Sequence, residues 1–362
     1  MFLGLGEVMM RIAPAGHRRL AQVLPGSVDC TFAGAEANCC VSLSMLDAKA
    51  RYLTMVPKNM LGDAVVANLR GLGVDTSAIA RRGEGRLGVY YVETGANQRG
   101  STVTYDREYS AISLAGPEEY DLAAAFDGVR WLHATGITPS LSEKAYQATL
   151  AVVREAKRRG CTVSCDLNYR KKLWRWRSGT KPNLLARECM SEVLQSVDLL
   201  IANEEDAADV LDIHAEGTNI EAGRLNIAGY LQVAREITRR FPNISRIAVS
   251  LRESYSADHN NWGAMLYEKS HDKALYAPLD AAGNYKPYEI RDIVDRVGGG
   301  DSFAAGLMFA LNTPEHADPQ QALKFAVAAS CLKHSIIGDF NFTSREEVES
   351  LMGGSGSGRV RR

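Results

Sequence analysis

The sequence lacks any long hydrophobic run and any large excess of charge of one sign. No apolar stretch approaches the roughly 20 residues that a membrane-spanning helix needs. The N-terminal segment reaches Glu7 and Arg11 too early to contain the apolar core of a signal peptide. The net charge of −1 gives no reason to expect a nucleic acid, whose binding usually requires a basic domain or stripe. We therefore expect a cytoplasmic protein that binds small molecules, with neither a membrane nor a nucleic acid as partner.

Cysteine is too sparse and too irregularly spaced to define a structural framework. The chain has seven cysteines, an odd number, with no Cys-x-x-Cys pair and no histidine at zinc-finger spacing. This pattern indicates neither a disulfide framework nor a structural metal site, and it predicts buried, reduced thiols. By contrast, 46% of the 362 residues are hydrophobic and 23% are charged. Such a composition is ordinary for a chain that folds around one large core or two smaller ones.

Short apolar or β-branched runs alternate with segments of helical periodicity along most of the chain. The predicted strands are Ala50–Val56, Val129–Ala134, Cys161–Asp166, Leu199–Ala202 and Arg246–Leu251, and the clearest predicted helices are Glu143–Arg159 and Ala222–Arg240. This alternation predicts an α/β fold in which helices cover both faces of a mostly parallel sheet. Ligands of such folds bind at the carboxyl ends of the strands, so the site is expected in the loops that follow them. These loops hold residues 166–170, 203–206, 252–254 and the glycine run that begins at Gly298.

Residues 1–35 and 86–115 depart from this alternation. The second segment has two strand-like runs on either side of a turn at residues 95–97, with no helix between them. We interpret parts of 10–35 and 86–115 as a small β-sheet that forms a lid on a single domain spanning residues 1–350. The exposed edge of such a sheet can pair with a second subunit, so we expect a homo-oligomer, a dimer or larger. Residues 351–362 are rich in Gly and Ser and end in arginines, which predicts a flexible, basic tail.

The most specific local signal is the run D-R-V-G-G-G-D-S-F-A-A-G at residues 295–306, just ahead of the apolar stretch Leu307–Leu311. Glycines before a helix let the backbone approach a ligand and point N–H groups at it, and the helix start adds a partial positive charge. The run therefore predicts an anion site. Asp301 has two interpretations here. It is either a carboxylate that takes part in chemistry or a helix N-cap that only accepts backbone N–H groups.

The whole run resembles the signature D-x-x-G-[AG]-G-D-x-F-x-x-G of the ribokinase-like (PfkB) carbohydrate kinases. The resemblance implies a three-layer α/β/α fold with a small β-sheet lid, and ATP as the phosphoryl donor. It also implies that Asp301 is the general base and that the N–H groups of Gly298, Gly299 and Gly300 form an anion hole. Gly299 stands where the family usually has Ala, and Arg296 where it more often has Thr. Neither change removes the base.

The resemblance continues near the N-terminus. Residues 32–38, F-A-G-A-E-A-N, are similar to the family's G-G-x-x-x-N segment, with Ala33 in place of the first Gly. Taken alone, this segment would be a plain turn before a helix. As part of the family pattern, it implies that Gly34 and Asn38 contact the substrate. Gly62-Asp63 also resembles a family motif, so the likeness extends from about residue 3 to residue 350.

A magnesium ion is expected beside the run Asn203-Glu204-Glu205-Asp206, which resembles the family's N-x-x-E motif but ends in Asp. Acidic side chains of this kind hold Mg²⁺ through water, because hard cations keep oxygen ligands and much of their hydration. We assign Asp206 as the water-mediated ligand, with Glu205 as a substitute, and Asn203 as a nucleotide contact. The alternative is a helix start capped by Asn203 with acidic residues in its first turn, which fits the run equally well.

Substrate selection is expected in the lid and in the loop after Asp166. A period of two places Tyr105 and Arg107 on one strand face, and Tyr90 can lie on the partner strand. Arg170 would add a second cation, and two arginines suit an acidic sugar better than a neutral one. Each arginine alone would more often be a solvated or ion-paired surface group.

Together with the run Asp166-x-Asn168-x-Arg170, these residues resemble the 2-keto-3-deoxygluconate kinases of the same family. That resemblance implies that Tyr90, Tyr105, Arg107 and Arg170 hold the keto acid and that Asn168 lies near ATP. Ser250 and Arg252 are assigned to the nucleotide from their position after a strand. Two alternatives remain open, a kinase for a neutral sugar such as fructose or ribose and a non-catalytic binding protein on the same scaffold.

Overall fold

The computed structural model of the chain describes residues 1–202, 204–214 and 227–354. Its parallel strands are β1 (Phe2–Leu5), β4 (Ala50–Pro57), β5 (Ile79–Arg82), β8 (Trp131–Thr135), β9 (Thr162–Asp166), β10 (Leu199–Ala202) and β11 (Arg246–Ser254). The strands β12 (Asn260–Glu268), β13 (Lys273–Ala277) and β14 (Tyr288–Ile290) join them in antiparallel pairs. Together they form a ten-stranded sheet in the order β13-β12-β11-β10-β9-β8-β1-β4-β5, with β14 paired to β12.

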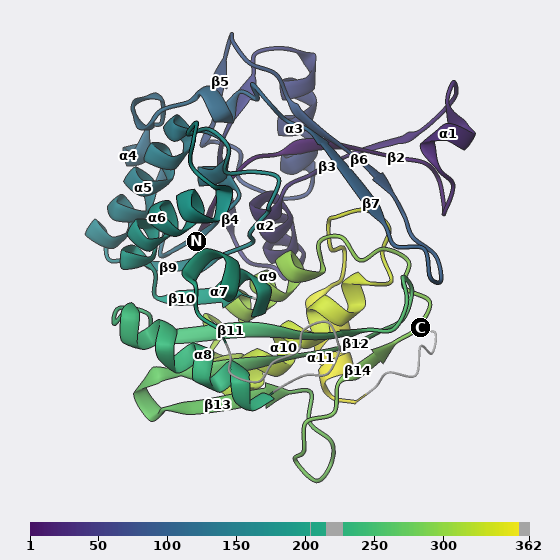
Figure 1. Ribbon diagram of the computed structural model, residues 1–362, viewed down its shortest axis with the longest axis vertical. Coiled ribbons are helices and arrows are strands. Elements are labelled where there is room, and N and C mark those ends of the chain that lie inside the picture. The colour runs from purple at the N-terminus through teal and green to yellow at the C-terminus, as the bar shows by residue number, and fades with distance from the viewer. Residues whose placement is uncertain (203, 215–226, 355–362) are drawn as a thin grey trace.

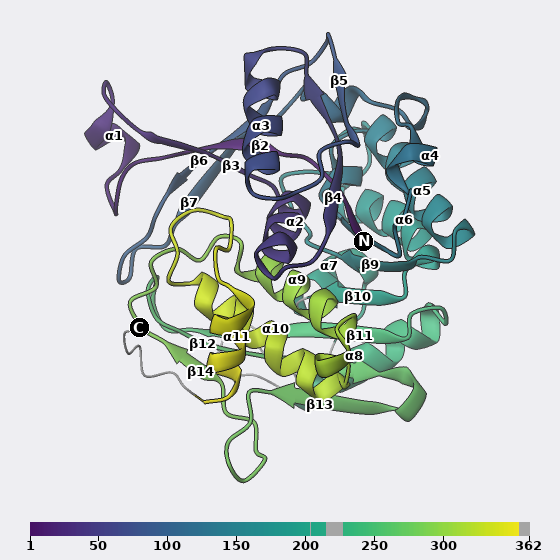
Figure 2. The same cartoon turned by 180° about the vertical axis from the view of Figure 1, so that it is seen from behind.

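Helices cover both faces of this sheet, as Figures 1 and 2 show from opposite sides. One face carries α4 (Leu122–Ala125), α5 (Glu143–Arg158), α6 (Pro182–Val193), α7 (Glu204–Leu211) and α8 (Ile227–Arg240). The other carries α2 (Ala35–Met45), α3 (Met60–Gly71), α9 (Gly299–Leu311), α10 (Pro319–Lys333) and α11 (Arg345–Met352). Every residue of β4 and β8 is buried, because side chains on both faces of a strand are covered in this arrangement.

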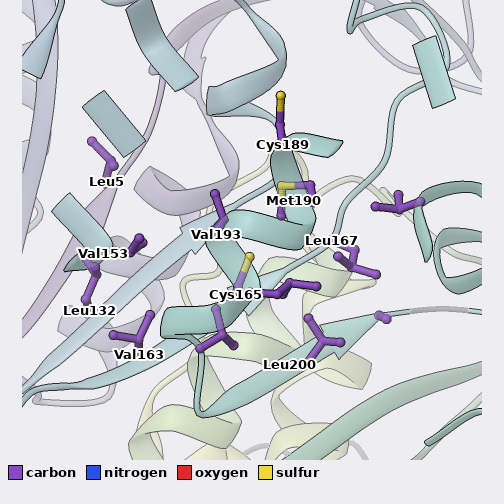
Figure 3. Close-up of a cluster of buried hydrophobic side chains, with 14 of the residues drawn as sticks. Leu5, Leu132, Val153, Val163, Cys165, Leu167, Cys189, Met190, Val193 and Leu200 are labelled. Atoms are coloured by element: carbon purple, nitrogen blue, oxygen red, sulfur yellow. The ribbon is translucent and has the colours of Figure 1, made fainter. Parts of the chain in front are cut away.

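The core between the sheet and one helical layer explains why the periodic segments fold as they do (Figure 3). Val153 of α5 and Met190 of α6 pack among Leu132, Val163 and other buried side chains of the central strands. Helix α5 begins where the Ser142 hydroxyl accepts a hydrogen bond from the N–H of Ala145, and lysine and arginine occupy its last turn. Burying one apolar stripe of such a helix on the sheet supplies most of its stability.

A second, four-stranded sheet projects from the main body. Its strands are β2 (Met9–Ala13), β3 (Asp29–Ala33), β6 (Gly88–Glu93) and β7 (Thr102–Asp106), in the order β3-β2-β6-β7, and the short helix α1 (Leu20–Val23) lies between β2 and β3 in the chain. β6 and β7 are the antiparallel pair expected from residues 86–115, and Tyr90 faces Tyr105 across it. Along β6 the side chains alternate between buried and half-buried, as expected for a sheet with one covered face.

Some details differ from the sequence-based expectations. The loop predicted at residues 252–254 is the end of β11, because the ladder with β12 continues from Arg252↔Trp262 to Ser254↔Asn260. An antiparallel hairpin has no helix between its strands, so the alternation of strands and helices did not reveal it. Helix α8 begins at Ile227, and residues 222–226 of the helix predicted there lie outside the described residues. Helix α11 ends at Met352, inside the predicted tail, whose residues 355–362 also lie outside the described residues.

The cysteines are free, and Cys39, Cys40, Cys161, Cys165 and Cys189 are buried as predicted. Cys30 is an exception, since it lies exposed on β3 of the projecting sheet, and Cys331 is half-buried. Within the parts of the chain that the structure describes, no helix is both long enough and apolar enough to cross a membrane.

Candidate active site

A cleft that is partly open to solvent lies between the projecting sheet, the ends of β9 and β10, and the start of α9. It brings together side chains that are far apart in the sequence. Asn203, which was also predicted to belong to the site, lies outside the described residues. The other predicted site residues all line the cleft, namely Gly34, Asn38, Tyr90, Tyr105, Arg107, Asn168, Arg170, Asp206, Ser250, Arg252, Gly298, Gly299, Gly300 and Asp301.

The glycine run forms a turn that leads into α9. Gly298 is the N-cap residue with a φ of 81°, and a Cβ atom there would lie 2.2 Å from the carbonyl oxygen of Asp339. Only glycine fits this position. The N–H groups of Gly300 and Asp301 have no backbone acceptor among the described residues, and a Cβ on Gly300 would meet nothing within 4 Å. The turn therefore presents free N–H donors to the cleft at a helix N-terminus, which is an anion site.

Asp301 lies in the first turn of α9, and its side chain caps no backbone N–H of that helix. Its Oδ2 accepts a hydrogen bond of 2.7 Å from the side-chain amide of Asn38 instead. Burial raises the pKa of Asp301 to about 6, although the bond from Asn38 acts in the opposite direction. The cap interpretation of this aspartate is therefore not supported by the structure, and a carboxylate that faces the cleft remains.

Asn38 is itself held by the turn that precedes α2. Its side-chain oxygen accepts from the backbone N–H of Gly34 at 3.2 Å, which directs its nitrogen toward Asp301. Gly34 packs so closely that a Cβ atom would lie 2.1 Å from the carbonyl oxygen of Glu7. The glycine-rich segment near the N-terminus thus positions the partner of Asp301.

The lid side of the cleft carries the predicted phenols and arginine, but two of them already have partners. Arg107 donates to Oε2 of Glu7 from Nε at 2.7 Å and also from Nη2, and both residues are buried. Its guanidinium carbon lies 5.4 Å from the centre of the Tyr105 ring, so these two side chains share one face as the period of two predicted. The hydroxyl of Tyr90 donates to Asp339 at 2.6 Å. The side chains of Arg107 and Tyr90 are therefore held in the wall of the cleft by carboxylates of the protein itself.

Arg170 behaves differently from Arg107. It is exposed, and the hydrogen bond found for it runs from Nη1 to the carbonyl oxygen of Tyr169, at 3.0 Å. Among the described residues it has no ion-pair partner. Its charge lowers the pKa of Asp166 and of Asp301 without a direct ion pair to either, so its guanidinium is available to an anionic ligand.

A buried ion-pair network behind the glycine turn escaped the sequence reasoning. Arg11 of β2 donates from its two terminal nitrogens to Asp295 and to Asp339, each at 2.5 Å. Burial alone would lower the pKa of Arg11, but the two carboxylates outweigh it and the pKa is raised. Because Asp295 precedes the glycine run and Asp339 touches Gly298, this network ties the projecting sheet to the anion site. No short-range motif marks it, since Arg11 lies 284 and 328 residues from its partners.

Carboxylates also line the wall below β9 and β10. The backbone N–H of Asn168 donates to Asp166 and that of Tyr169 donates to Asp206, both at 3.0 Å. Burial raises the pKa of Asp166 well above its usual range, and the charges of Asp206 and Asp301 add to this effect. In the described part of the chain, no group of three His, Cys, Asp or Glu side chains is arranged to hold a metal ion directly.

Comparison with known proteins is consistent with this geometry. The sequence profile described as "pfkB family carbohydrate kinase" matches residues 3–233. The 2-dehydro-3-deoxygalactonokinase of Haloferax volcanii is 29% identical, with 98% of this chain and 96% of the relative covered. The 2-dehydro-3-deoxygluconokinase of Thermoproteus tenax is also 29% identical, with 88% of this chain and 85% of the relative covered.

A solved structure of a protein with a related name is also similar to this chain. The crystal structure of the 2-dehydro-3-deoxygluconokinase of Thermotoga maritima is similar to this chain with a TM-score of 0.86 and 41% identity, covering 98% of this chain and 99% of its own. The predicted fold class, a mostly parallel sheet between helical layers with a small additional sheet, is confirmed by this likeness. The matched profile spans more than half of the sequence, and the structural likeness extends through the glycine turn of α9. The chain is therefore a member of the pfkB family of carbohydrate kinases.

Proposed function

We propose that this protein transfers the γ-phosphoryl group of ATP to the 6-hydroxyl of 2-keto-3-deoxygluconate, with Asp301 as the general base. The observation that carries the proposal is the position of Asp301, a carboxylate held by Asn38 beside free N–H donors of the glycine turn. A base next to an anion site is what phosphoryl transfer to an alcohol requires.

The proposed step is a single in-line displacement. Asp301 takes the proton of the sugar hydroxyl while that oxygen forms a bond to the γ-phosphorus and the bond to the leaving ADP oxygen breaks. The N–H groups of Gly300 and Asp301 would donate to the oxygens of the transferring group, where negative charge accumulates. Positioning and charge stabilisation supply most of the acceleration in such reactions.

The acidic wall fits a hydrated magnesium ion. Asp166 and Asp206 offer the carboxylate oxygens that Mg²⁺ prefers, and Glu205 also lines the cleft. We assign Asp206, with Asp166 beside it, as the residues that would hold this ion through water. When bound, the ion would neutralise charge on the ATP phosphates.

The acidic nature of the substrate is supported by Arg170 and by the lid. Arg170 forms no direct ion pair among the described residues, and Tyr105 lies beside Arg107 at the same cleft. A carboxylate of the substrate would supply a direct ion-pair partner for Arg170. The names of the Thermoproteus tenax and Thermotoga maritima relatives indicate the gluco epimer, and that of the Haloferax volcanii relative indicates the galacto epimer. Both keto acids therefore belong in the test.

The proposal is tested by ADP release with MgATP against 2-keto-3-deoxygluconate, its galactonate epimer, fructose, ribose and gluconate, with Asp301→Asn as the control. Turnover on a keto acid that is lost in the variant would support both the reaction and its base. Turnover on a neutral sugar alone would keep the kinase and reject the acidic substrate. No turnover on any acceptor, with folded protein, would favour a non-catalytic binding protein.

We also propose a location and an oligomeric state for the protein. A kinase that consumes ATP and a metabolic sugar acid is expected in the cytoplasm, without a membrane or a nucleic acid as partner. Most residues of β3 in the projecting sheet are exposed, which favours a homo-oligomer that covers this sheet with a second copy. Light scattering coupled to size-exclusion chromatography tests the proposed homo-oligomer. A monomer at working concentration would contradict it.

A further inference from the structure

One lysine is completely buried and has no role in the proposed reaction. Lys333 is the last residue of α10, the helix that lies beside α9 (Figure 2), and its relative exposure is 0%. Its ammonium group donates to the carbonyl oxygen of Ile336 at 3.0 Å and forms no ion pair within the described chain. A buried charge is costly unless other charges compensate it. The surroundings of Lys333 must therefore supply this compensation.

The loop that follows this lysine lies against the glycine turn. Within residues 334–339, the N–H of Gly338 donates to Asp295 at 3.1 Å. The carbonyl oxygen of Asp339 lies so close to Gly298 that a Cβ atom there would be 2.2 Å from it. The hydrogen bond from the buried ammonium group ends on a carbonyl oxygen of the same loop. The lysine therefore holds the loop that supports the anion site.

Two cations and three carboxylates act on one another around this loop. Burial lowers the pKa of Lys333 most strongly. The charges that act in the opposite direction belong to Asp295, Asp339 and Asp301. Arg11, the other cation, acts with burial, and it is paired directly with Asp295 and Asp339. The three carboxylates thus compensate the buried ammonium group, which in turn offsets part of the repulsion among them.

Asp301 responds to the charge of the same lysine. Burial raises the pKa of Asp301 most strongly, and the hydrogen bond from Asn38 opposes it. The charge of Asp339 acts with burial, and the cations Arg170 and Lys333 act against it. Arg170 is exposed and would pair with the substrate carboxylate, so its effect on Asp301 would weaken in the complex, whereas that of Lys333 would remain. Other acidic groups whose pKa is raised by burial and, to a smaller extent, by the charge of Asp301 are Glu36, Cys39 and Asp166.

We propose that Lys333 is a positioning residue for the phosphoryl transfer, which holds the loop of residues 334–339 against the glycine turn and favours the ionised form of Asp301 through its fixed charge. The inference rests on the proposed function, because it takes Asp301 to be the general base. A simpler role would be to cap α10, since lysines near a helix C-terminus often donate to the last carbonyl groups. An exposed lysine serves that purpose and keeps its hydration. A buried lysine exerts its charge through protein rather than water, where the charge is screened less.

The test uses two substitutions of Lys333 in the full-length protein. Lys333→Gln keeps a donor for the carbonyl oxygen of Ile336 but removes the charge, and Lys333→Met removes both. The measurement is kcat/KM for the keto acid between pH 5 and 8 with saturating MgATP. We expect the midpoint of the pH profile to lie about half a pH unit or more higher in each variant, because a charge that favours the carboxylate is lost.

The size of the effect should depend on pH. At pH 5.5 this shift lowers kcat/KM of Lys333→Gln about two- to threefold, and the difference from the wild type should disappear by about pH 8, where the base is ionised in both proteins. Lys324→Gln is the matched control, at a half-buried position nine residues earlier on α10 and about 14 Å away along the helix axis. It should keep the wild-type midpoint.

The outcomes separate this inference from the proposed function. Wild-type protein that turns over no keto acid would reject the proposed reaction and this inference with it. Wild-type turnover with a midpoint that neither variant moves would overturn the inference alone, and Lys333 would then only cap α10. Partial unfolding of a variant lowers the rate by a common factor, whereas loss of the charge moves the midpoint. If Lys333→Gln does not fold, Lys333→Met decides the question, because a methionine side chain is ordinary in a protein core.

Discussion

The side-chain nitrogen of Asn38 lies 2.7 Å from Oδ2 of Asp301, so a residue 263 positions away in the sequence holds the proposed base. The bond favours the charged carboxylate, whereas burial favours the protonated form and dominates. Asp301 therefore combines a raised pKa with a fixed orientation. Its pKa of about 6 leaves the base charged at neutral pH and more basic than an ordinary aspartate.

The first prediction concerns the pH dependence of turnover. A general base acts only when deprotonated, so kcat/KM should rise with pH and reach half its plateau near the Asp301 pKa of about 6. Asn38→Ala removes a bond that stabilises the carboxylate, so the midpoint should move to higher pH. Initial rates between pH 5 and 9, with subsaturating sugar acid, measure both profiles. Identical midpoints in the two proteins would contradict the role of Asn38.

The second prediction concerns the base itself. Asp301→Asn keeps the size of the side chain and its place beside Asn38 but cannot accept a proton. We expect kcat to fall by about 10²–10⁴, the usual contribution of general base catalysis. ADP binding, measured by calorimetry, should persist within a few-fold, because the glycine turn is unchanged. A variant that keeps more than half of the wild-type kcat would assign the base to another residue.

The third prediction contrasts the two arginines assigned to the sugar acid. Arg170 is exposed and without an ion-pair partner among the described residues, so Arg170→Gln should raise KM for the keto acid about tenfold while leaving the free energy of unfolding unchanged. Arg107 is buried against Glu7, so Arg107→Gln should raise KM and also destabilise the fold by about 3–5 kcal/mol. Urea unfolding and steady-state kinetics separate the two effects. If neither variant alters KM, the substrate is not bound through these cations.

The fourth prediction concerns the tip of the projecting sheet. The carbonyl oxygen of Asn97 accepts from the N–H of Ala257 at 2.7 Å, and the N–H of Asn97 donates to Asp258 at 3.2 Å. Arg296 donates to the carbonyl oxygen of the same Ala257, so the segment before the glycine turn and the lid both contact this turn. We expect ADP with the keto acid to slow hydrogen exchange in residues 86–115, because closure keeps water from the γ-phosphate. Equal exchange with and without ligands would count against a moving lid.

Sequence patterns predicted the features that depend on neighbouring residues. The glycine run before an apolar helix could be interpreted locally, because free N–H donors and a left-handed Gly298 are properties of a few consecutive residues. The position of Tyr105 beside Arg107 followed from the period of two in a strand. The order of strands and helices likewise follows from local periodicity, which is why the main sheet and the small sheet were both expected.

Contacts between distant segments could not be predicted in this way. Glu7 lies 100 residues from Arg107, and nothing in either segment indicates that the two charges are buried together. Asp339 follows α10 in an irregular loop, and its links to Arg11 and Tyr90 appear only when the lid is folded onto the site. The predicted phenol and arginine both line the cleft, but the partners that they already have in the protein were not predicted. Burial of a charge is a property of the assembled fold rather than of a local pattern.

The last prediction concerns the stability of the fold rather than its chemistry. Glu36 of α2 is almost fully buried, and its Oε1 accepts from the N–H and the hydroxyl of Thr135 at 3.1 and 2.7 Å. Burial raises the pKa of Glu36 from 4.5 to about 7, and the bond from Thr135 only partly offsets this. Between these two values the folded chain holds a proton that the unfolded chain has lost, so the free energy of unfolding should fall as pH rises.

At about 1.4 kcal/mol per pKa unit, this effect amounts to about 3 kcal/mol between pH 4.5 and 7.5. Glu36→Gln keeps the acceptor for Thr135 and cannot ionise, so it should be more stable than the wild type above pH 7 and lose this part of the pH slope. Glu346→Gln, at an exposed position of α11, is the matched control and should follow the wild type. Urea unfolding at several pH values measures all three proteins. Parallel curves for the wild type and Glu36→Gln would mean that Glu36 is charged in the folded protein throughout this pH range. The hydrogen bond from Thr135 would then lower the pKa of Glu36 by at least as much as burial raises it.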